Sequence, residues 1–250
     1  MSTNFQAFKR LVNLSKQEIG RVVLHQYSER MDIKNEGLAV RTLIRIVDSA
    51  LQLSREQGFQ ALRLRDLSDA VGLSMNRLYR YVRNKDDLLH LIQSYGHTMN
   101  ARILLDQIQA VHHPLERLRV AVRTQLWLSE VLQDWFLFWH LEARTMAAAG
   151  KQQAIQAELS MEELFCNIIR TGQRQGIFRA VDPELTAAVL KAMLQEWYLM
   201  RWKYEERQID VETYGRFVQA LIERHLLSEG KPDAGPPQPL DLCQSDWQES

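Results

Sequence analysis

The side chains between residues 75 and 85 are the part of the sequence best suited to read a nucleic acid. Asn76 can bond adenine and Arg77 can bond guanine through two atoms each, while tyrosine hydroxyls and lysine amino groups suit phosphates. Residues 63–85 carry six basic and two acidic side chains, a local excess of four positive charges. This chemistry predicts a DNA-binding segment. Its candidate contact residues are Arg63, Ser74, Met75, Asn76, Arg77, Tyr79, Tyr81 and Lys85.

Helices must hold this segment in place, and the apolar spacing predicts three of them. The first covers residues 41–57 and ends at Gly58, in the left-handed conformation that favours glycine. The second covers residues 64–71 and is followed by a tight turn at residues 72–74. The third covers residues 75–82, and its buried anchors are Leu78 and Val82. Two short helices joined by a three-residue turn that contains glycine form a helix-turn-helix unit.

The net charge of the whole chain hides this basic segment. The 250 residues contain 31 Lys and Arg against 31 Asp and Glu, and a neutral total by itself argues against a DNA-binding protein. Residues 1–98, however, hold 15 basic and 10 acidic residues, so the rest of the chain carries the opposite excess of five negative charges. Such an asymmetry indicates an interaction surface at the N-terminal end.

The stretch GFQALRLRDLSDAVGLSMNRLYRYVRNKDDLL resembles the N-terminal helix-turn-helix of TetR-type transcriptional regulators. The matching residues are Gly58, Phe59, Asp66, Gly72, Ser74, Leu78, Tyr79, Lys85 and Leu88. The resemblance implies that Ser74 caps the recognition helix and that Tyr79 and Lys85 contact phosphate. Three positions depart from the family pattern: Arg63 replaces a threonine, Asn76 replaces a glycine, and Tyr81-Val82 replaces His-Phe. Asn76 brings a base-reading side chain to a position that the family often leaves bare.

The rest of the chain indicates an all-α protein. Only 11 Gly and 6 Pro interrupt it, and helix N-caps are expected at Ser15, Asn84, Asp182 and Asp210. By resemblance, a three-helix helix-turn-helix DNA-binding domain at residues 37–98 precedes a larger helical ligand-binding and dimerisation domain at residues 99–229. Residues 1–36 are expected to form a helical extension, and the Pro-rich residues 230–250 a disordered tail.

The N-terminal extension exceeds the short leader that such regulators usually have. Its apolar residues, among them Leu11, Ile19 and Val23, indicate one or two amphipathic helices that pack on the first domain helix or on a partner subunit. The alternative is a basic arm that enters the minor groove of DNA. Four acidic residues between positions 18 and 36 dilute the positive charge of such an arm, which favours the packing interpretation.

Five of the six tryptophans lie between positions 127 and 202, in the half of the chain that forms the ligand cavity of TetR-type regulators. A cavity lined by these residues would suit a small apolar or aromatic effector, with a cationic side chain to meet an anionic group. The alternative is that the aromatic residues only fill the core. The candidate ligand-binding residues are Trp135, Trp139, His140, Arg144, Phe165, Trp197 and Arg201.

Two amphipathic helices are predicted after Asp182 and after Asp210. In TetR-type regulators the last two long helices pair with those of a second subunit, so the resemblance implies a homodimer. Palindromic readout is an independent reason for a dimer, because one short recognition helix reads few bases. The expected interface residues are Leu185, Val189, Met193, Val218, Leu221 and Ile222.

Other functions lack their characteristic residues in this sequence. Cys166 and Cys243 make neither a disulfide framework nor a metal cluster, and the pair His112-His113 has no further ligand at zinc-like spacing. No nucleophile motif or phosphate loop is present, so we expect no enzyme, no metal and no cofactor. The apolar runs are too short for a membrane span and the first residues lack a secretory signal, which predicts a cytoplasmic protein without a membrane partner.

The leading hypothesis is a ligand-responsive, sequence-specific DNA-binding transcriptional regulator, a repressor that a small effector releases from a palindromic operator. Two alternatives belong to other classes: a helical enzyme that uses His140 and Glu142 in an aromatic-lined cavity, and a protein-interaction scaffold. Activation is the alternative to repression.

Overall fold

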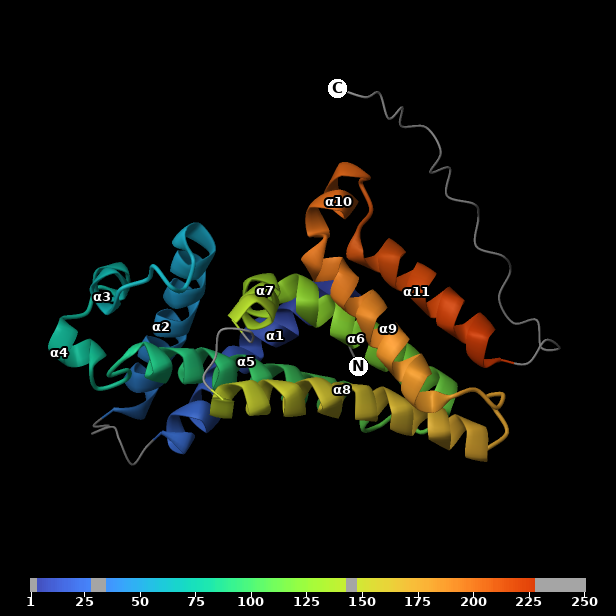
Figure 1. Ribbon diagram of the computed structural model, residues 1–250. Coiled ribbons are helices and arrows are strands. Elements are labelled where there is room, and N and C mark those ends of the chain that lie inside the picture. The colour runs from blue at the N-terminus through green and yellow to red at the C-terminus, as the bar shows by residue number, and fades with distance from the viewer. Residues whose placement is uncertain (1–3, 28–34, 143–147, 228–250) are drawn as a thin grey trace, which may run out of the picture.

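The computed structural model of the protein describes residues 4–27, 35–142 and 148–227, and every regular element in these ranges is an α-helix. The predicted all-α fold class is confirmed. Figure 1 shows helices α2 (Glu36–Gln57), α3 (Leu64–Val71) and α4 (Met75–Leu78) at one end of the molecule. The other helices are α1 (Phe5–Gln26), α5 (Lys85–Ile108), α6 (Pro114–Val131), α7 (Gln133–Glu142), α8 (Ala148–Arg174), α9 (Pro183–Leu199), α10 (Arg201–Glu206) and α11 (Val211–Leu226).

Helix α1 forms most of the predicted N-terminal extension. It begins after Asn4, whose side-chain oxygen accepts a hydrogen bond from the Ala7 amide at 2.9 Å. The predicted cap at Ser15 is wrong. Ser15 lies inside α1, where the backbone amides are already bonded, and its hydroxyl donates to the Leu11 carbonyl at 3.0 Å. The apolar face of α1, including the fully buried Phe8, packs on α2, α5 and α6.

The helix-turn-helix forms where the sequence predicts it, with changed boundaries. Helix α2 begins at Glu36 instead of residue 41, because the Asn35 side chain caps it by accepting from the Leu38 amide at 3.0 Å. It ends at Gly58, whose φ of 80° is positive as expected although its ψ of 145° is extended. Helix α3 has the predicted bounds, and Gly72 takes the left-handed conformation with φ 67° and ψ 39°.

The recognition helix α4 is shorter than the predicted helix over residues 75–82. After Leu78 the chain tightens into turns, in which the Arg80 and Tyr81 amides bond the carbonyls three residues earlier. This tighter winding is common at helix ends. The predicted anchors Leu78 and Val82 are both fully buried.

Helix α5 runs from the helix-turn-helix into the larger half of the molecule without a break (Figure 1). Its 24 residues begin at the predicted cap, where the Asn84 side chain accepts from the Asp87 amide at 2.7 Å. Tyr95, Met99 and Ile103 along its length are buried. The predicted domain boundary between residues 98 and 99 therefore lies within one helix, and the domain limits stay predictions.

The larger half packs α6, α8, α9 and α11 against one another. Asp182 caps α9 as predicted by accepting from the Glu184 and Leu185 amides, and Asp210 caps α11 as predicted by accepting from the Thr213 amide. Phe165 of α8 and Trp197 of α9 are fully buried in this half. The predicted tail at residues 230–250 lies outside the described residues.

Helix α7 fits closely against α5 through one tryptophan. At Gly96 of α5 a Cβ atom would lie 1.8 Å from Nε1 of Trp135, so a residue without a side chain is needed there. The same Nε1 donates a hydrogen bond to the Ile92 carbonyl at 3.1 Å. Because the indole lies against the backbone of α5, the position of α7 is fixed relative to α5.

We predict that Gly96→Ala lowers the free energy of unfolding by about 3 kcal/mol, because the added methyl group displaces Trp135 and breaks its bond to Ile92. Urea unfolding followed by circular dichroism measures the change. Gly37→Ala in α2 is the matched control, since its nearest neighbours would lie at 3.7 Å. Alanine there should raise stability by up to about 1 kcal/mol. Equal stability of the two variants would contradict the close packing of Trp135.

Candidate DNA-binding face and effector cavity

Helix α4 presents polar side chains to solvent and apolar ones to the core. Asn76 and Arg77 are exposed, and Tyr79, which follows the helix, is 46% exposed. Leu78 is fully buried on the opposite side. Within the described residues, no hydrogen bond or ion pair engages the side chains of Asn76 and Arg77. Both are therefore available to contact the edges of bases.

Three predicted contact residues differ from expectation. Met75 and Tyr81 are half-buried and pack against the core. Tyr81 does so because the chain turns after Leu78 instead of continuing as an exposed helix. Ser74 occupies the N-cap position of α4, but its side chain makes no capping hydrogen bond. The cap that the resemblance implies for Ser74 is therefore not formed.

Arg63 and Lys85 lie beside this face, and both already have partners. Arg63 donates to the Asp66 carboxylate through Nε at 3.0 Å and Nη2 at 2.9 Å, and this hydrogen bonding lowers the pKa of Asp66. The Lys85 amino group donates to the Gln60 carbonyl at 2.8 Å and lies 5.0 Å from the centre of the Phe59 ring. An ammonium group has three donors, so Lys85 retains donors for a phosphate.

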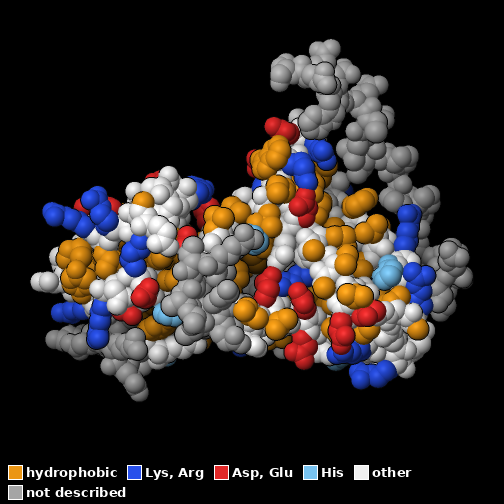
Figure 2. All heavy atoms as spheres, in the orientation of Figure 1, with side chains coloured by type: hydrophobic (Ala, Val, Ile, Leu, Met, Phe, Trp, Pro, Cys, Tyr) orange, Lys and Arg blue, Asp and Glu red, His pale blue; other side chains and the backbone are white. Residues whose placement is uncertain are grey.

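Basic side chains surround the α3–α4 end. Figure 2 shows Lys and Arg projecting on several sides of it with some Asp and Glu among them, whereas the larger half carries clusters of acidic side chains together with Lys and Arg. A duplex approaching the α3–α4 end would meet a positive potential and would stay away from the acidic half.

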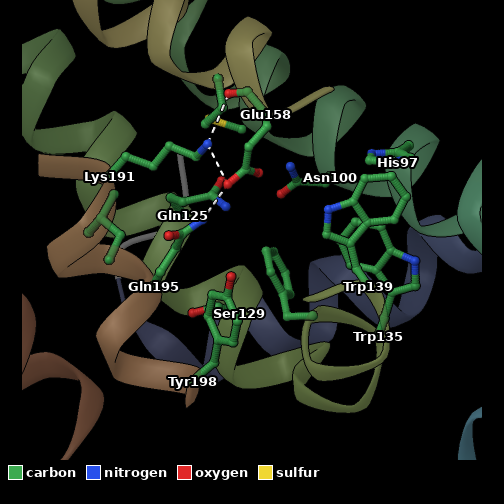
Figure 3. Close-up of a pocket in the computed structure, with 13 residues that line it drawn as sticks. His97, Asn100, Gln125, Ser129, Trp135, Trp139, Glu158, Lys191, Gln195 and Tyr198 are labelled. Atoms are coloured by element: carbon green, nitrogen blue, oxygen red, sulfur yellow. Dashed lines mark hydrogen bonds and ion pairs between the residues drawn. The ribbon is translucent and has the colours of Figure 1, made fainter. Parts of the chain in front are cut away.

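A small cavity of about 60 Å³ lies in the larger half, where α5, α6, α7, α8 and α9 meet. Figure 3 shows the indoles of Trp135 and Trp139 on one side of it and the side chains of Glu158, Lys191 and Gln195 toward the other. The cavity is therefore aromatic on one side and polar on the other. The remaining polar residues of its lining are His97, Asn100, Gln125, Ser129 and Tyr198.

Of the predicted ligand-binding residues, Trp135 and Trp139 line this cavity. Phe165 and Trp197 do not line it and are fully buried in the core, as the alternative interpretation of the aromatic residues expects. Arg201 is also outside the lining, and its Nε donates to Glu130 at 3.0 Å.

The two remaining predicted residues do not add to the cavity. His140 is half-buried near the end of α7 but does not line the cavity, because the helical spacing turns it away from Trp135 and Trp139. Arg144 lies outside the described residues. The expected cationic side of the cavity is thus not provided by His140 or Arg201.

Sequence reasoning missed Lys191 and the carboxylates that bind it. The Lys191 side chain is only 7% exposed, and its amino group lies 2.7 Å from Glu158 Oε1 and 3.5 Å from Glu162 Oε1. The signal is present in the sequence, because the buried residues of α9 include Ala187 and Leu194 at positions four before and three after Lys191. A lysine at a core position of an amphipathic helix is rare unless a partner compensates its charge.

Three polar atoms around the cavity are buried and have no hydrogen-bond partner in the described part of the chain: His97 Nε2, Asn100 Oδ1 and Gln125 Oε1. His97 packs edge-on against Trp139 and Trp135, with ring centroids 4.1 Å and 5.2 Å apart. Burial lowers the pKa of His97 to about 4, although the charge of Glu158 opposes the shift. His97 is therefore neutral at pH 7.

Helix α7 connects the cavity to the helix-turn-helix. Phe138 packs edge-on against Phe59 with ring centroids 5.2 Å apart, and Asp134 lies 3.2 Å from Arg55 of α2. Phe59 is also the ring beneath the Lys85 amino group. Helix α7, whose indoles line one side of the cavity, thus contacts residues that lie directly beneath the DNA-binding face.

Exposed apolar side chains form a stripe on α9 and α11. Leu185, Val189 and Leu221, all expected at a dimer interface, are 66%, 59% and 47% exposed, and Phe217 is 56% exposed as well. Met193, also expected there, is half-buried.

The expectation of an interface role is wrong for Val218 and Ile222. Both are buried within the subunit, because they lie on the side of α11 that packs on α6 and α9. Phe217, four residues before Leu221, is the outward-facing residue that the sequence prediction missed.

Two further findings limit what the described ranges can contain. No helix in them is long and apolar enough to cross a membrane. No group of three or more His, Cys, Asp or Glu in them is placed to hold a metal ion.

Comparisons with known proteins match the two halves separately. Residues 46–92 match the family described as bacterial regulatory proteins, tetR family, and residues 111–208 match the Tetracyclin repressor-like C-terminal domain. The HTH-type transcriptional regulator HbdR of Aromatoleum sp. (strain CIB) is 23% identical over 186 residues, which cover 74% of this chain and 81% of HbdR.

Solved structures have the same fold. A transcriptional regulator from Saccharomonospora viridis in complex with choline superimposes with a TM-score of 0.66 at 21% identity, covering 75% of this chain and 98% of the other. AibR in complex with isovaleryl coenzyme A and operator DNA gives a TM-score of 0.64 at 20% identity, covering 72% of this chain and 97% of AibR.

The fold and the exposed recognition helix define a helix-turn-helix transcriptional regulator. The chain belongs to the TetR family of bacterial regulatory proteins. It is therefore a DNA-binding transcriptional regulator.

We predict that His97 makes the protein less stable in acid. Its pKa is about 4 in the folded protein and 6.5 ordinarily, so between these values the unfolded chain binds a proton that the folded protein does not. The titration of His97 should therefore lower the free energy of unfolding by about 2 kcal/mol when the pH falls from 7 to 5.

His97→Phe tests this prediction, because it keeps an aromatic ring that does not titrate. Urea unfolding of both proteins at pH 7 and pH 5 should show a smaller loss of stability for the variant. An equal loss in both proteins would mean that His97 does not contribute.

Proposed function

We propose that the protein is a repressor that binds a palindromic operator as a homodimer in the cytoplasm and that a small apolar or aromatic effector releases it. The observation that carries this proposal is the position of α7. Trp135 and Trp139 line the cavity, and Phe138 on the same helix contacts Phe59 beside the helix-turn-helix. A ligand that moves α7 would therefore act on the DNA-binding face.

The proposed functions of the three segments follow the predicted domains. Residues 37–98 would bind DNA, residues 99–229 would bind the effector and the partner subunit, and residues 1–36 would be a helical extension, whose helix α1 packs on α2, α5 and α6. None of these roles requires a catalytic residue, so the proposed function is not that of an enzyme.

The proposed DNA contacts divide into two kinds. Asn76 and Arg77 would read bases, because they are exposed on α4 and unpaired within the described residues. Tyr79 and Lys85 would hold phosphates, which set the register of the protein on DNA but carry no sequence information. Arg63, Ser74, Met75 and Tyr81 would lie at the border of this contact.

The size of the cavity supports a release mechanism. Ligand pockets usually measure about 300–1,000 Å³, whereas this cavity measures about 60 Å³. An effector of ordinary size must therefore widen it, and it would favour the conformation in which the cavity is wide. The effector can shift DNA binding only by its difference in affinity for the two conformations.

The exposed stripe on α9 and α11 supports the homodimer. Leu185, Val189, Phe217 and Leu221 would meet the same residues of a second copy, because a two-fold interface uses one surface twice. Two recognition helices would then read two half-sites of a palindrome.

Selection of bound fragments from random duplexes tests the proposed function, and the selected sequence should be palindromic. Asn76→Ala should cost about 1–3 kcal/mol of binding free energy at one base position of each half-site. Fluorescence anisotropy with the selected duplex and its single-base variants measures this loss.

Lys85→Gln is the matched comparison, because it removes a charge while keeping an N–H donor. It should weaken binding to all sequences alike and reduce the slope of log affinity against log salt by about 1. If both variants bind selected and random DNA like the unmodified protein, the assignment of α4 as the reading helix is wrong.

We predict that Leu221→Arg converts the dimer into a monomer, because a two-fold interface would bring two buried guanidinium groups together. Sedimentation velocity at micromolar concentration measures the mass. Leu14→Arg is the control, since Leu14 of α1 is 81% exposed but lies outside the stripe. A monomeric unmodified protein, or an equally dimeric Leu221→Arg variant, would contradict the proposed interface.

A further inference from the structure

The cavity lacks a free positive charge. Its one cation, Lys191, already donates to the Glu158 carbonyl at 3.0 Å and contacts the carboxylates of Glu158 and Glu162. His97 is neutral, and within the described residues no other Lys or Arg lines the cavity. Two carboxylates thus share one ammonium group, and the charged groups at this site sum to about one negative charge at pH 7.

The unpaired atoms of the cavity are mainly acceptors. Asn100 Oδ1 and Gln125 Oε1 are buried and accept no hydrogen bond from the described residues. Figure 3 shows these two amides and Glu158 around the same space, with Trp135 and Trp139 beside them. A ligand that enters this space must bring hydrogen-bond donors, because a buried acceptor left unpaired is costly.

We propose that the cavity takes a protonated primary or secondary amine with an aromatic or apolar body. The N–H groups of the ligand would donate to Asn100 and Gln125, its charge would be balanced by Glu158, and its body would lie against the indoles of Trp135 and Trp139. This inference rests on the proposed function, because it names the chemical class of the effector.

Each other class of ligand leaves part of the site unsatisfied. A carboxylate would have to compete with Glu158 and Glu162 for Lys191 while facing two unpaired acceptors. A quaternary ammonium has the charge that indoles attract but no N–H to donate. A neutral aromatic alcohol can donate once, and it leaves the second acceptor and the negative charge without a partner.

Calorimetric titration of the full chain with three matched probes tests the proposal. Phenethylammonium, phenethyl alcohol and hydrocinnamate have similar bodies and differ in the charge and donors of the head group. We expect phenethylammonium to bind at least about tenfold more tightly than either of the others, a difference of about 1.4 kcal/mol. Equal or tighter binding of the alcohol or the acid overturns the proposal, and so does the absence of binding by all three.

Two variants locate the contact within the cavity. Glu158→Gln removes the proposed counter-charge, and Asn100→Leu removes one acceptor at similar volume. Each should weaken phenethylammonium binding by about tenfold or more and leave phenethyl alcohol binding nearly unchanged. Glu163→Gln is the control, because Glu163 lies on the same helix but lines a separate groove with Arg117. An equal effect of all three substitutions overturns the proposal.

A DNA-release assay separates this inference from the proposed function. Phenethylammonium should release the protein from its selected duplex at the concentrations at which it binds. Binding without release supports the ligand class and contradicts effector control of DNA binding. DNA binding that persists while no amine binds contradicts the ligand class and leaves the regulator function standing.

Discussion

The contact between the Trp135 indole and the backbone of α5 is the constraint on which the arrangement of the molecule depends. Residue 96 has no side chain, so the indole reaches the Ile92 carbonyl and α7 lies directly on α5. From that position one side of α7 forms the aromatic wall of the cavity, and Phe138 reaches the helix-turn-helix. A side chain at residue 96 would displace α7. It would therefore move the aromatic wall of the cavity and Phe138 together, because both belong to this short helix.

Much of the fold could be predicted because a helix cap depends mainly on residues that are close in the sequence. Side-chain caps at Asn84, Asp182 and Asp210 satisfy backbone amides of their own helices, so sequence alone locates them. The prediction failed at Ser15, where an upstream cap at Asn4 makes the helix start earlier and leaves the serine inside it. A capping residue type thus favours a helix start, but the residues around it decide whether it is used, and α3, α4 and α6 begin without a side-chain cap.

The candidate site was harder to predict because it depends on which face of each helix is buried. The motif of the helix-turn-helix specified Asn76 and Arg77 on an exposed helix. Among aromatic residues, however, composition does not distinguish Trp139 at the cavity from Trp197 in the core, because helix packing alone separates them. Lys191 was overlooked for the same reason, since its burial and its partners on α8 come together only in three dimensions.

The unbroken helix α5 has a geometric consequence for signalling. Its 24 residues span about 36 Å at the usual rise of 1.5 Å per residue, and one end lies beside α4 while His97 and Asn100 lie at the cavity. His97 is 12 residues from the start of α5, so the arm from the cavity to the end beside α4 is about 18 Å. A tilt of about 5° about the cavity moves that end by about 1.6 Å. The same tilt in each subunit of a dimer would change the separation of the two recognition helices by about 3 Å, close to the 3.4 Å step between base pairs.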